Sequence, residues 1–182
     1  RRPPGMDLDR LMERYRQSGF YELVEPDYRY RPALIPNDPD FLDGDQWGLQ
    51  NEGQNGGRTD ADVDAPEAWN TITDAEEIIV AIIDTGIRYT HEDLKANMWV
   101  NVGEIPGNGV DDDRNGIVDD LHGLNAVESS GDPWDDVGHG THVAGIAAAF
   151  GNNGEGVAGV SWGSRILPVR VLGAQNQGND FG

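Results

Sequence analysis

Residues 78–86 read IIVAIIDTG, an apolar run that ends in an aspartate, a threonine and a glycine. Six consecutive apolar residues rich in isoleucine predict a strand that is buried on both faces of a parallel sheet. Functional groups of such sheets gather beyond the carboxyl ends of the strands, which is where Asp84 stands. Asp84 is therefore the first candidate for a functional residue, with Thr85 and Gly86 forming the turn that leads the chain out of the sheet.

The segments that follow this strand complete an α/β pattern. Residues 101–136 are dense in Asp, Asn and Gly and lack apolar periodicity, so they predict an irregular excursion. The small side chains from Thr141 to Phe150 predict a helix that is buried all round. Residues 166–173, ILPVRVLG, predict a second buried strand in which Pro168 is easiest to place near the beginning. Strand, loop, helix and strand in this order predict an α/β fold with a parallel sheet.

The N-terminal part has a different character. Apolar residues recur with helical spacing between Asp7 and Gly19, which are placed to cap the two ends of a short amphipathic helix. Residues 20–24, FYELV, predict a strand, and the prolines of residues 26–39 predict a linker. Further on, Asp64 is placed to cap a short helix that has Pro66 in its first turn.

Composition excludes several classes of function. The 182 residues carry 13 basic and 33 acidic side chains, a net charge of −20, which disfavours nucleic acid and anionic membranes as partners. The absence of cysteine excludes disulfides, thiolate zinc sites and a cysteine nucleophile. The longest apolar run, residues 78–83, is too short to span a bilayer. Because the chain opens RRPPG and its first methionine is Met6, we expect a piece of a longer protein. No signal-peptide pattern stands at its start.

His139 is the second candidate, in the stretch VGHGTHV (residues 137–143). An aspartate that accepts the imidazole Nδ1 proton holds the tautomer in which Nε2 can take a proton from a nucleophile. Asp84 and His139 could form such a pair, although an Asp after a strand is also a common cap and a His at a helix start is also a common surface residue. Zinc binding by His139 and His142 is the weaker interpretation, because their spacing is three and a third ligand is lacking.

Together these motifs resemble the subtilisin family of serine proteases. The resemblance extends over about residues 36–182, through IIVAIIDTGI, HEDL, GHGTHVAGIAAA, GVAGV and LPVRVLG. It implies a parallel-sheet subtilisin-like fold and peptide-bond hydrolysis by an Asp-His-Ser triad, with Asp84 as the orienting acid and His139 as the general base. The family's serine lies in a GTSMA-like motif that these residues lack, so we expect an inactive fragment, truncated after the histidine helix and the following strand.

The resemblance also implies a domain division. Residues 1–32 are similar to the C-terminal, α-β part of the family's inhibitory propeptide, and residues 33–182 to the N-terminal part of the peptidase domain. The expected partners are therefore the chain's own propeptide and, in the complete enzyme, a polypeptide substrate; the expected location is extracellular. Gln175, Asn176, Gln177 and Gly178 match a family segment that pairs with extended substrate, although a flexible glycine-rich loop is the other interpretation.

Residues 108–120, NGVDDDRNGIVDD, predict a calcium site from their spacing. With Asp111 as position 1, the loop matches positions 1, 3, 5, 6, 7 and 9 of an EF-hand-like calcium loop. The ligands would be the side chains of Asp111, Asp113, Asn115 and Asp119 and the carbonyl of Ile117. The twelfth position is His122 instead of Glu, with Asp120 as the substitute ligand. The alternative is a plain solvated acidic loop, but five closely spaced aspartates repel one another unless a cation intervenes.

A second calcium site is implied by the thermitase-like branch of the family. There Asp38, Asp93 and the loop of residues 149–157 surround one ion. That loop would supply the Asn153 side chain and the carbonyls of Gly151, Glu155 and Val157. Residues 125–132 align with another calcium loop of the branch, but Asn125 and Ser130 stand where acids are expected.

Two functions of different classes follow. The first is a secreted, calcium-stabilised serine endopeptidase of which this chain is a part. The second is a noncatalytic calcium-binding scaffold or pseudo-protease that uses only this part of the fold. A reading frame that continues to a GTSMA-like motif would favour the first, and a stop codon after Gly182 the second.

Overall fold

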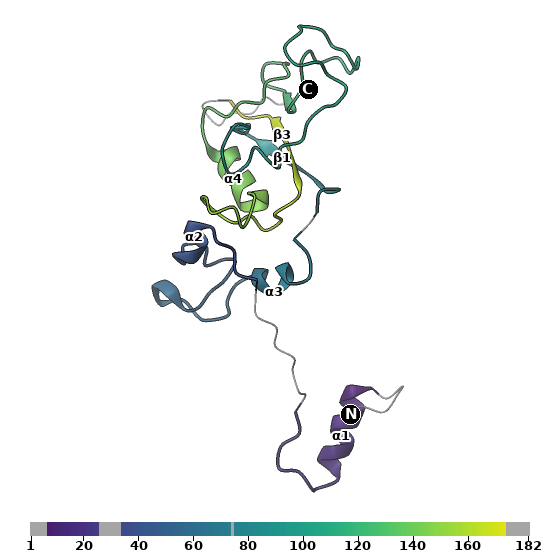
Figure 1. Ribbon diagram of the computed structural model, residues 1–182, viewed down its shortest axis with the longest axis vertical. Coiled ribbons are helices and arrows are strands. Elements are labelled where there is room, and N and C mark those ends of the chain that lie inside the picture. Colours follow the sequence, from purple (N-terminus) through teal and green to yellow (C-terminus); the bar gives the residue numbers. More distant parts are fainter. Residues whose placement is uncertain (1–6, 26–33, 74, 174–182) are drawn as a thin grey trace. The chain divides into compact units, whose positions relative to one another are not determined.

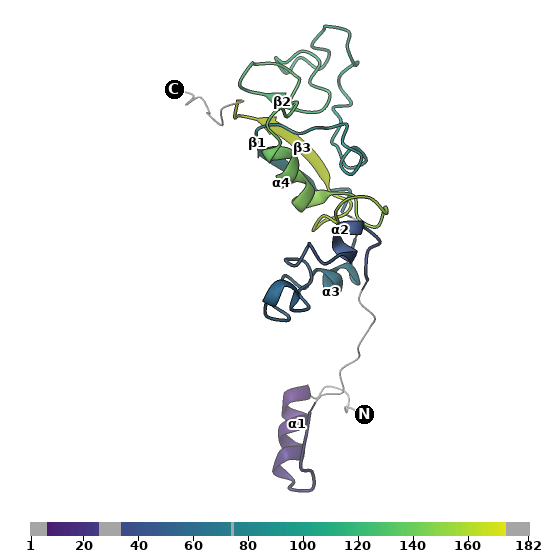
Figure 2. The same ribbon diagram turned by 90° about the vertical axis from the view of Figure 1, so that its left-hand side faces the viewer.

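The computed structural model describes residues 7–25, 34–73 and 75–173, and the chain forms two compact units, residues 1–32 and 33–182. We call them the N-terminal unit and the main unit. Their elements are α1 (Leu8–Gln17), α2 (Pro39–Leu42), the 3₁₀ turn η1 (Gln54–Gly56), α3 (Ala65–Trp69), β1 (Ile79–Asp84), β2 (Leu124–Asn125), α4 (His139–Ala148) and β3 (Arg165–Arg170). Figure 1 labels all of them except η1 and β2, and Figure 2 labels β2.

The N-terminal unit contains the predicted helix but not the predicted strand. Helix α1 begins after Asp7, whose side chain makes no capping hydrogen bond, and is followed by Gly19 in a left-handed conformation (φ 68°). The strand prediction for residues 20–24 is wrong: the chain turns back, and Arg16 Nη2 donates to the Val24 carbonyl at 3.1 Å. A strand needs a neighbour for its ladder of hydrogen bonds, and the described residues of this unit offer none.

The main unit is built on a parallel sheet with the strand order β1-β3-β2. Strand β1 pairs with β3 along its whole length, from Ile79 opposite Arg165 to Asp84 opposite Arg170. The two-residue strand β2, which lies inside the predicted irregular excursion, pairs with the end of β3. The predicted α/β parallel-sheet fold is therefore confirmed, and the long excursion between β1 and α4 remains largely irregular (Figure 2).

Only one face of β1 is covered by the described residues. Ile82 is buried, but Ile79 and Ile83 remain 53% and 65% exposed. The prediction of burial on both faces is wrong for this chain, because α4 packs on the Ile82 side and β1 is an edge strand. An apolar run alone does not distinguish a strand covered on two faces from one covered on a single face.

Pro168 lies in the middle of the central strand instead of near its beginning. The backbone groups of Ile166 and Arg170, two residues before and after Pro168, point away from β1. Ile166 N–H donates to the Asn97 carbonyl at 2.7 Å, and the Arg170 carbonyl accepts from Ala126 N–H at 2.8 Å. Between them, pairing on this side is interrupted, because the bridge of Met98 ends at Ile166 and β2 begins opposite Val169. The missing N–H of Pro168 faces this interruption and costs no ladder bond.

Helix α4 lies along the sheet and forms the main core with it (Figures 1 and 2). Its small residues Ala144 and Ala148 are fully buried against Ile82 and Ile166. The opposite side, which includes His142 and Ile146, is exposed, so the prediction of burial all round is wrong for the described chain. Small side chains let one side of α4 approach the strands closely, but they do not require cover on the other.

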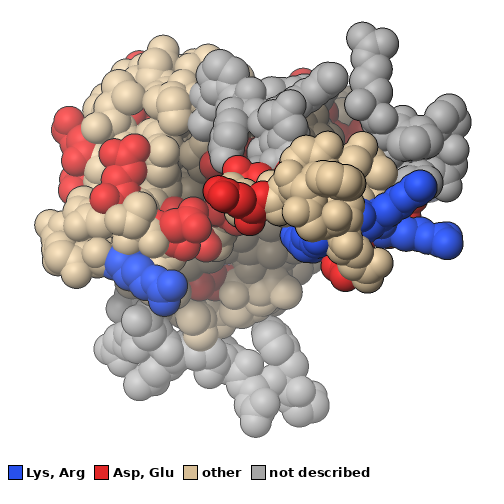
Figure 3. Space-filling model, turned by 90° about the horizontal axis from the view of Figure 1, so that it is seen from below, with Lys and Arg blue, Asp and Glu red and all other residues tan. Residues whose placement is uncertain are grey.

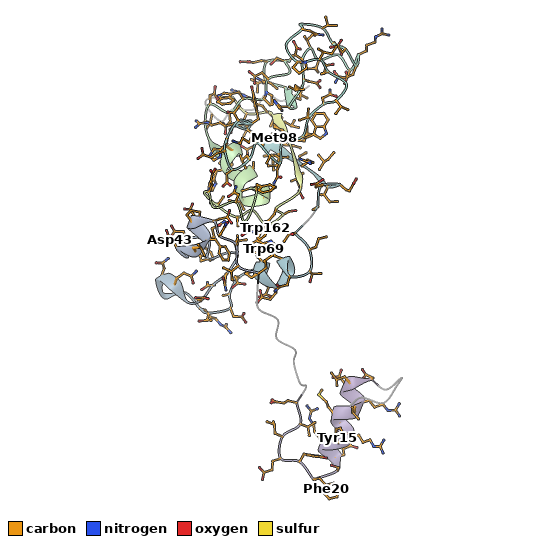
Figure 4. The ribbon with its side chains drawn as sticks, in the orientation of Figure 1. Tyr15, Phe20, Asp43, Trp69, Met98 and Trp162 are labelled. Carbon is orange, nitrogen blue, oxygen red and sulfur yellow. The ribbon has the colours of Figure 1, made fainter. Side chains whose placement is uncertain are left out.

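A second apolar cluster joins the N-terminal segments of the main unit to the loop after α4. Trp69 of α3 and Trp162 pack with their ring centroids 4.7 Å apart (Figure 4), and Trp69 Nε1 donates to the Val160 carbonyl at 2.9 Å. Helix α3 begins after Asp64 as predicted, but Asp64 has φ 53° and its side chain makes no capping bond. The cluster holds residues 41–69 against the loop that follows α4.

Acidic side chains lie at several places on the face drawn in Figure 3, in keeping with the net charge of −20. None of the helices within the described ranges has the length and apolar character that a membrane span requires.

Candidate active site and metal-binding loops

Asp84 ends β1 and is followed at once by a tight turn. Its side chain is 14% exposed, and its Oδ1 accepts the Thr85 N–H at 2.7 Å. Gly86 has φ +98°, and a Cβ there would lie 2.2 Å from the Pro133 carbonyl oxygen. Glycine is therefore required for the chain to turn away from the sheet beside Asp84.

His139 is the first residue of α4 and stands between two glycines with separate functions. Gly138 precedes the helix with φ +106°, a conformation that other residues rarely adopt. A Cβ at Gly140 would lie 2.2 Å from the Gly86 carbonyl oxygen. The absence of a side chain at Gly140 thus lets the start of α4 lie directly against the turn that follows β1.

This approach brings the two candidate residues together. His139 Nδ1 lies 2.8 Å from Asp84 Oδ1 and 2.9 Å from Asp84 Oδ2. The carboxylate is mostly buried, whereas the imidazole is 62% exposed. A carboxylate at Nδ1 selects the tautomer with a proton on that nitrogen and leaves Nε2 as a base for a group that approaches from solvent.

The described serines of the main unit form no hydrogen bond with His139. Ser161 and Ser164 instead bond to each other, with 2.6 Å between their Oγ atoms, in the turn before β3. Ser129 and Ser130 follow β2, where Ser130 pairs through its backbone with Asn125. Within residues 34–73 and 75–173, no serine is therefore hydrogen-bonded to the pair as a nucleophile.

The acidic excursion folds around carboxylate and amide side chains. Asp111 accepts the N–H groups of Asn115 and Gly116 at 3.1 and 2.9 Å, and Gly116 has φ +98°. Asp113 and Asp120 share the side-chain amides of Asn101 and Asn115 at 2.8–3.2 Å. The residues predicted from EF-hand spacing at the first, third and fifth positions thus lie together, as does Asp120.

The later positions of the predicted loop lie elsewhere. The Asp119 carboxylate accepts the N–H groups of Asn108 and Gly109 at 3.2 and 3.0 Å, in the turn before the loop. His122 stacks on Tyr89, with ring centroids 4.6 Å apart. The N–H of Ile117 donates to Asn115 Oδ1 at 2.8 Å, and its carbonyl remains a predicted ligand.

Glu104 is a member of this site that the spacing argument missed. One oxygen from each of Glu104, Asp111 and Asp113 lies within 4.8 Å of the others, so the three could hold a metal ion. Glu104 is buried and accepts N–H groups of Asp112, Asp113 and Asp119. It stands seven residues before the loop, outside any EF-hand pattern, and an acid close to an aspartate cluster was the only signal for it.

Hydrogen bonds stabilise the ionised form of Asp113. The side-chain amide of Asn101 is the main cause that lowers the pKa of Asp113 below its ordinary value, and bonds from Asn115 add to it. A group of hard oxygen ligands fits calcium better than a thiophilic metal.

The side chains predicted for the second site are linked by hydrogen bonds, and their metal binding stays a prediction. Asp38 is fully buried and accepts the Asn152 N–H at 2.6 Å. Asp93, 2% exposed, accepts the Asn153 side-chain amide and the Val157 N–H, both at 2.9 Å. Among the described residues, neither carboxylate has a basic side chain within ion-pair distance. Buried carboxylates without such a partner fit a bound cation.

The carbonyl ligands predicted in this second site remain predictions. Gly151 packs against the ring of Trp162, where a Cβ would lie 2.5 Å from the ring atoms. The N–H of Glu155 donates to Asn153 Oδ1 at 2.8 Å, which closes the loop locally.

Two predictions remain, the calcium loop of residues 125–132 and the substrate groove, and only the first lies within the described residues. In residues 125–132, Asn125 is buried and its Oδ1 accepts the N–H groups of Val127 and Glu128, so this side chain is satisfied by its own loop. The predicted substrate-groove residues Gln175, Asn176, Gln177 and Gly178 lie outside the described residues.

Comparisons with known proteins show the family of the chain. The model of the Subtilase family matches residues 75–181, more than half of the chain. Subtilisin-like protease 1 of Plasmodium berghei is 44% identical over 128 residues, which cover 70% of this chain and 20% of that protein. The thermophilic serine proteinase of Bacillus sp. strain AK1 is 32% identical over 172 residues, with 94% and 34% covered.

Solved structures of proteases share the fold. A protease from Pseudoalteromonas arctica matches with a TM-score of 0.51 and 31% identity, over 80% of this chain and 41% of that chain. The Aeromonas sobria serine protease, solved with its chaperone, matches with a TM-score of 0.57 and 26% identity, over 82% and 22%. The chain thus spans about a fifth to a third of the length of the two curated relatives above. It belongs to the subtilase family.

Proposed function

We propose that this chain is part of a serine endopeptidase in which Asp84 orients His139 and His139 acts as general base. The observation that carries the proposal is the 2.8 Å separation of His139 Nδ1 and Asp84 Oδ1. In the complete enzyme, Nε2 would take the proton of a serine hydroxyl as that serine attacks a peptide carbonyl. Water would then hydrolyse the resulting acyl-enzyme.

The proposal requires a serine from sequence outside these 182 residues, so the chain alone is expected to be inactive. We propose residues 1–32 as the end of an inhibitory propeptide and residues 33–182 as the beginning of the peptidase domain. The division of the chain into compact units at the same boundary supports this assignment. Gln175–Gly178 are proposed to border the groove for a polypeptide substrate.

We propose calcium as the stabilising ion, bound at two places. Glu104, Asp111, Asp113, Asn115 and Asp120 would hold one ion, and Asp38, Asp93 and Asn153 the other. Oxygen-only donor sets and buried carboxylates without basic partners support this proposal. Secretion is proposed as well, because the relatives include an extracellular protease of Xanthomonas campestris and a cell wall-associated protease of Bacillus subtilis.

A fluorophosphonate probe, which labels activated serines, tests the catalytic proposal. We expect labelling of the protein translated from the whole natural reading frame and none of the 182-residue chain. His139→Ala in the whole protein should abolish labelling. His142→Ala is the matched control, because His142 lies nearly one turn further along α4 and is exposed as well. Labelling of the isolated chain that depends on His139 would disprove the missing-nucleophile part of the proposal.

The noncatalytic calcium-binding scaffold is the second candidate. The oxygen-rich loops favour it, and it needs no serine beyond the described residues. A reading frame that stops after Gly182, together with retained calcium binding, would support the scaffold over the peptidase.

A further inference from the structure

Asp135 is a buried carboxylate that the proposed mechanism does not use. It is fully buried, and its Oδ1 accepts hydrogen bonds from Thr85 Oγ1 at 3.0 Å, Val137 N–H at 2.9 Å and Gly138 N–H at 2.8 Å. Its Oδ2 accepts from Thr141 N–H at 3.0 Å and Thr141 Oγ1 at 2.5 Å. Among the described residues, no basic side chain forms an ion pair with it. Its carboxylate is therefore stabilised by these hydrogen-bond donors, and the Arg88 side chain bonds to the Asp135 carbonyl instead.

The donors come from the two segments that carry the candidate catalytic pair. Thr85 directly follows Asp84, and residues 137–141 form the start of α4 around His139. Thr85 Oγ1 also accepts the Gly140 N–H at 2.9 Å. The first N–H groups of a helix need acceptors, and Gly138 at the N-cap has no side chain to provide one. Asp135 and Thr85 supply these acceptors from outside the helix.

We propose that Asp135 is the positioning residue that fixes the start of α4 against the turn after β1 and so holds His139 Nδ1 at Asp84. This inference rests on the proposed function of that pair. Asp135 does not touch the imidazole; it acts through Thr85 and through the backbone on both sides of His139. A negative charge at the start of α4 also has a favourable interaction with the helix dipole.

The contacts require a carboxylate rather than an amide. Oδ1 faces the backbone N–H groups of Val137 and Gly138, and Oδ2 faces that of Thr141. Backbone N–H groups cannot reverse their role, so either orientation of an asparagine amide would direct its NH₂ at one of them. Burial raises the pKa of Asp135, but the bonds from Gly138, Thr141 and Val137 outweigh it, and the pKa lies below its ordinary value. The carboxylate is thus ionised in the folded protein.

The histidine tautomer provides a test that needs no enzyme activity. We would label the histidines of the full 182-residue chain with ¹⁵N and record long-range ¹H–¹⁵N correlation spectra at alkaline pH, using His139→Gln to assign the His139 signals. Wild type should show the Nδ1–H tautomer at His139, and Asp135→Asn should lose it as the dominant species. Asp136→Asn is the matched control, because it removes the same charge from the neighbouring residue, which pairs with Arg170 instead.

The signals of His122, stacked on Tyr89, report whether each variant is folded. Retention of the Nδ1–H tautomer in a folded Asp135→Asn variant would overturn the proposal. If Asp135→Asn is unfolded, Thr85→Val decides. It removes both links of the turn, the bond from Thr85 Oγ1 to Asp135 and the acceptor for the Gly140 N–H, but leaves the bonds of Asp135 to residues 137–141. Loss of the Nδ1–H tautomer in Thr85→Val supports the proposal, and its retention overturns it. A wild type without that tautomer would instead contradict the proposed Asp84–His139 pair itself.

Discussion

At the scale of single residues, two glycines determine how closely α4 approaches the end of β1. Side chains at Gly86 or Gly140 would collide with backbone carbonyl oxygens at 2.2 Å, and backbone cannot yield as a flexible side chain can. Gly145 is in the same helix, but a Cβ there would meet only Val157 Cγ2, at an ordinary 3.9 Å. The glycines of α4 are therefore not equivalent.

We predict that Gly140→Ala destabilises the folded chain by about 1–3 kcal/mol, the usual cost of overpacking, because α4 must move away from the turn. Gly145→Ala is the matched control and should be neutral or stabilising by up to about 1 kcal/mol, owing to the higher helix propensity of alanine. Urea denaturation followed by circular dichroism gives both free energies of unfolding. Equal effects of the two substitutions would contradict the close-approach argument.

The residues of the candidate pair could be predicted from sequence because each stands in a recognisable motif at the end of an element. Glu104 and Asp135 could not. Asp135 reaches Thr85, which lies 50 residues earlier in the chain, and Glu104 binds the backbone of residues 112–119. Their roles arise from contacts between segments, which the local spacing of residues does not encode.

At the scale of elements, those with their own periodicity or capping pattern were predictable, namely α1, α3, α4, β1 and β3. The errors concern properties that depend on neighbours. Residues 20–24 have strand propensity but no partner strand in the part of the chain that the structure describes, and the apolar run of β1 is covered there on one face only. Strand β2 has two residues and exists only because β3 lies beside it, so no local pattern indicated it.

The proposed calcium site of Asp38, Asp93 and Asn153 should make the free energy of unfolding depend on calcium. We predict that excess chelator lowers the melting temperature of the chain, because an ion at 100 times its dissociation constant stabilises the folded state by about 2.7 kcal/mol. Asp93→Asn should reduce this shift by removing a buried ligand. The exposed neighbour Glu92 supplies the control, Glu92→Gln, which should keep the wild-type shift. A wild-type melting temperature that chelator does not change would contradict the proposal that calcium binds at either site.

At the scale of the whole molecule, the chain combines a strong negative charge with an uncovered apolar sheet face. The charge of −20 disfavours association, whereas the exposed side of β1 favours it. An edge strand with unpaired backbone groups adds to the tendency to associate. The balance depends on ionic strength, because salt screens the charges but does not weaken the apolar contact.

We therefore predict that the 182-residue chain self-associates as salt is raised, as measured by light scattering after size-exclusion chromatography. Replacing both Ile79 and Ile83 with threonine should reduce this association and leave the circular dichroism spectrum unchanged. Ile82→Thr is the control on the buried face: it should lower the free energy of unfolding by about 1–3 kcal/mol through an unsatisfied hydroxyl. A monomeric wild type at high salt would count against the exposed face as an association surface.

The interruption opposite Pro168 has an evolutionary consequence. The chain leaves the sheet after Met98 and returns at Leu124. Asn101 closes the excursion, because its N–H donates to the Leu121 carbonyl and its side-chain amide donates to Asp113 and Asp120. Within residues 100–123, the pairing of β3 constrains only Gly123, where a Cβ would lie 2.2 Å from the Pro168 carbonyl oxygen, so the acidic loop before Gly123 is structurally separable from the sheet. It could be lengthened, shortened or exchanged between lineages without a shift in strand register, so that ion binding is gained or lost independently of the pair at the end of β1.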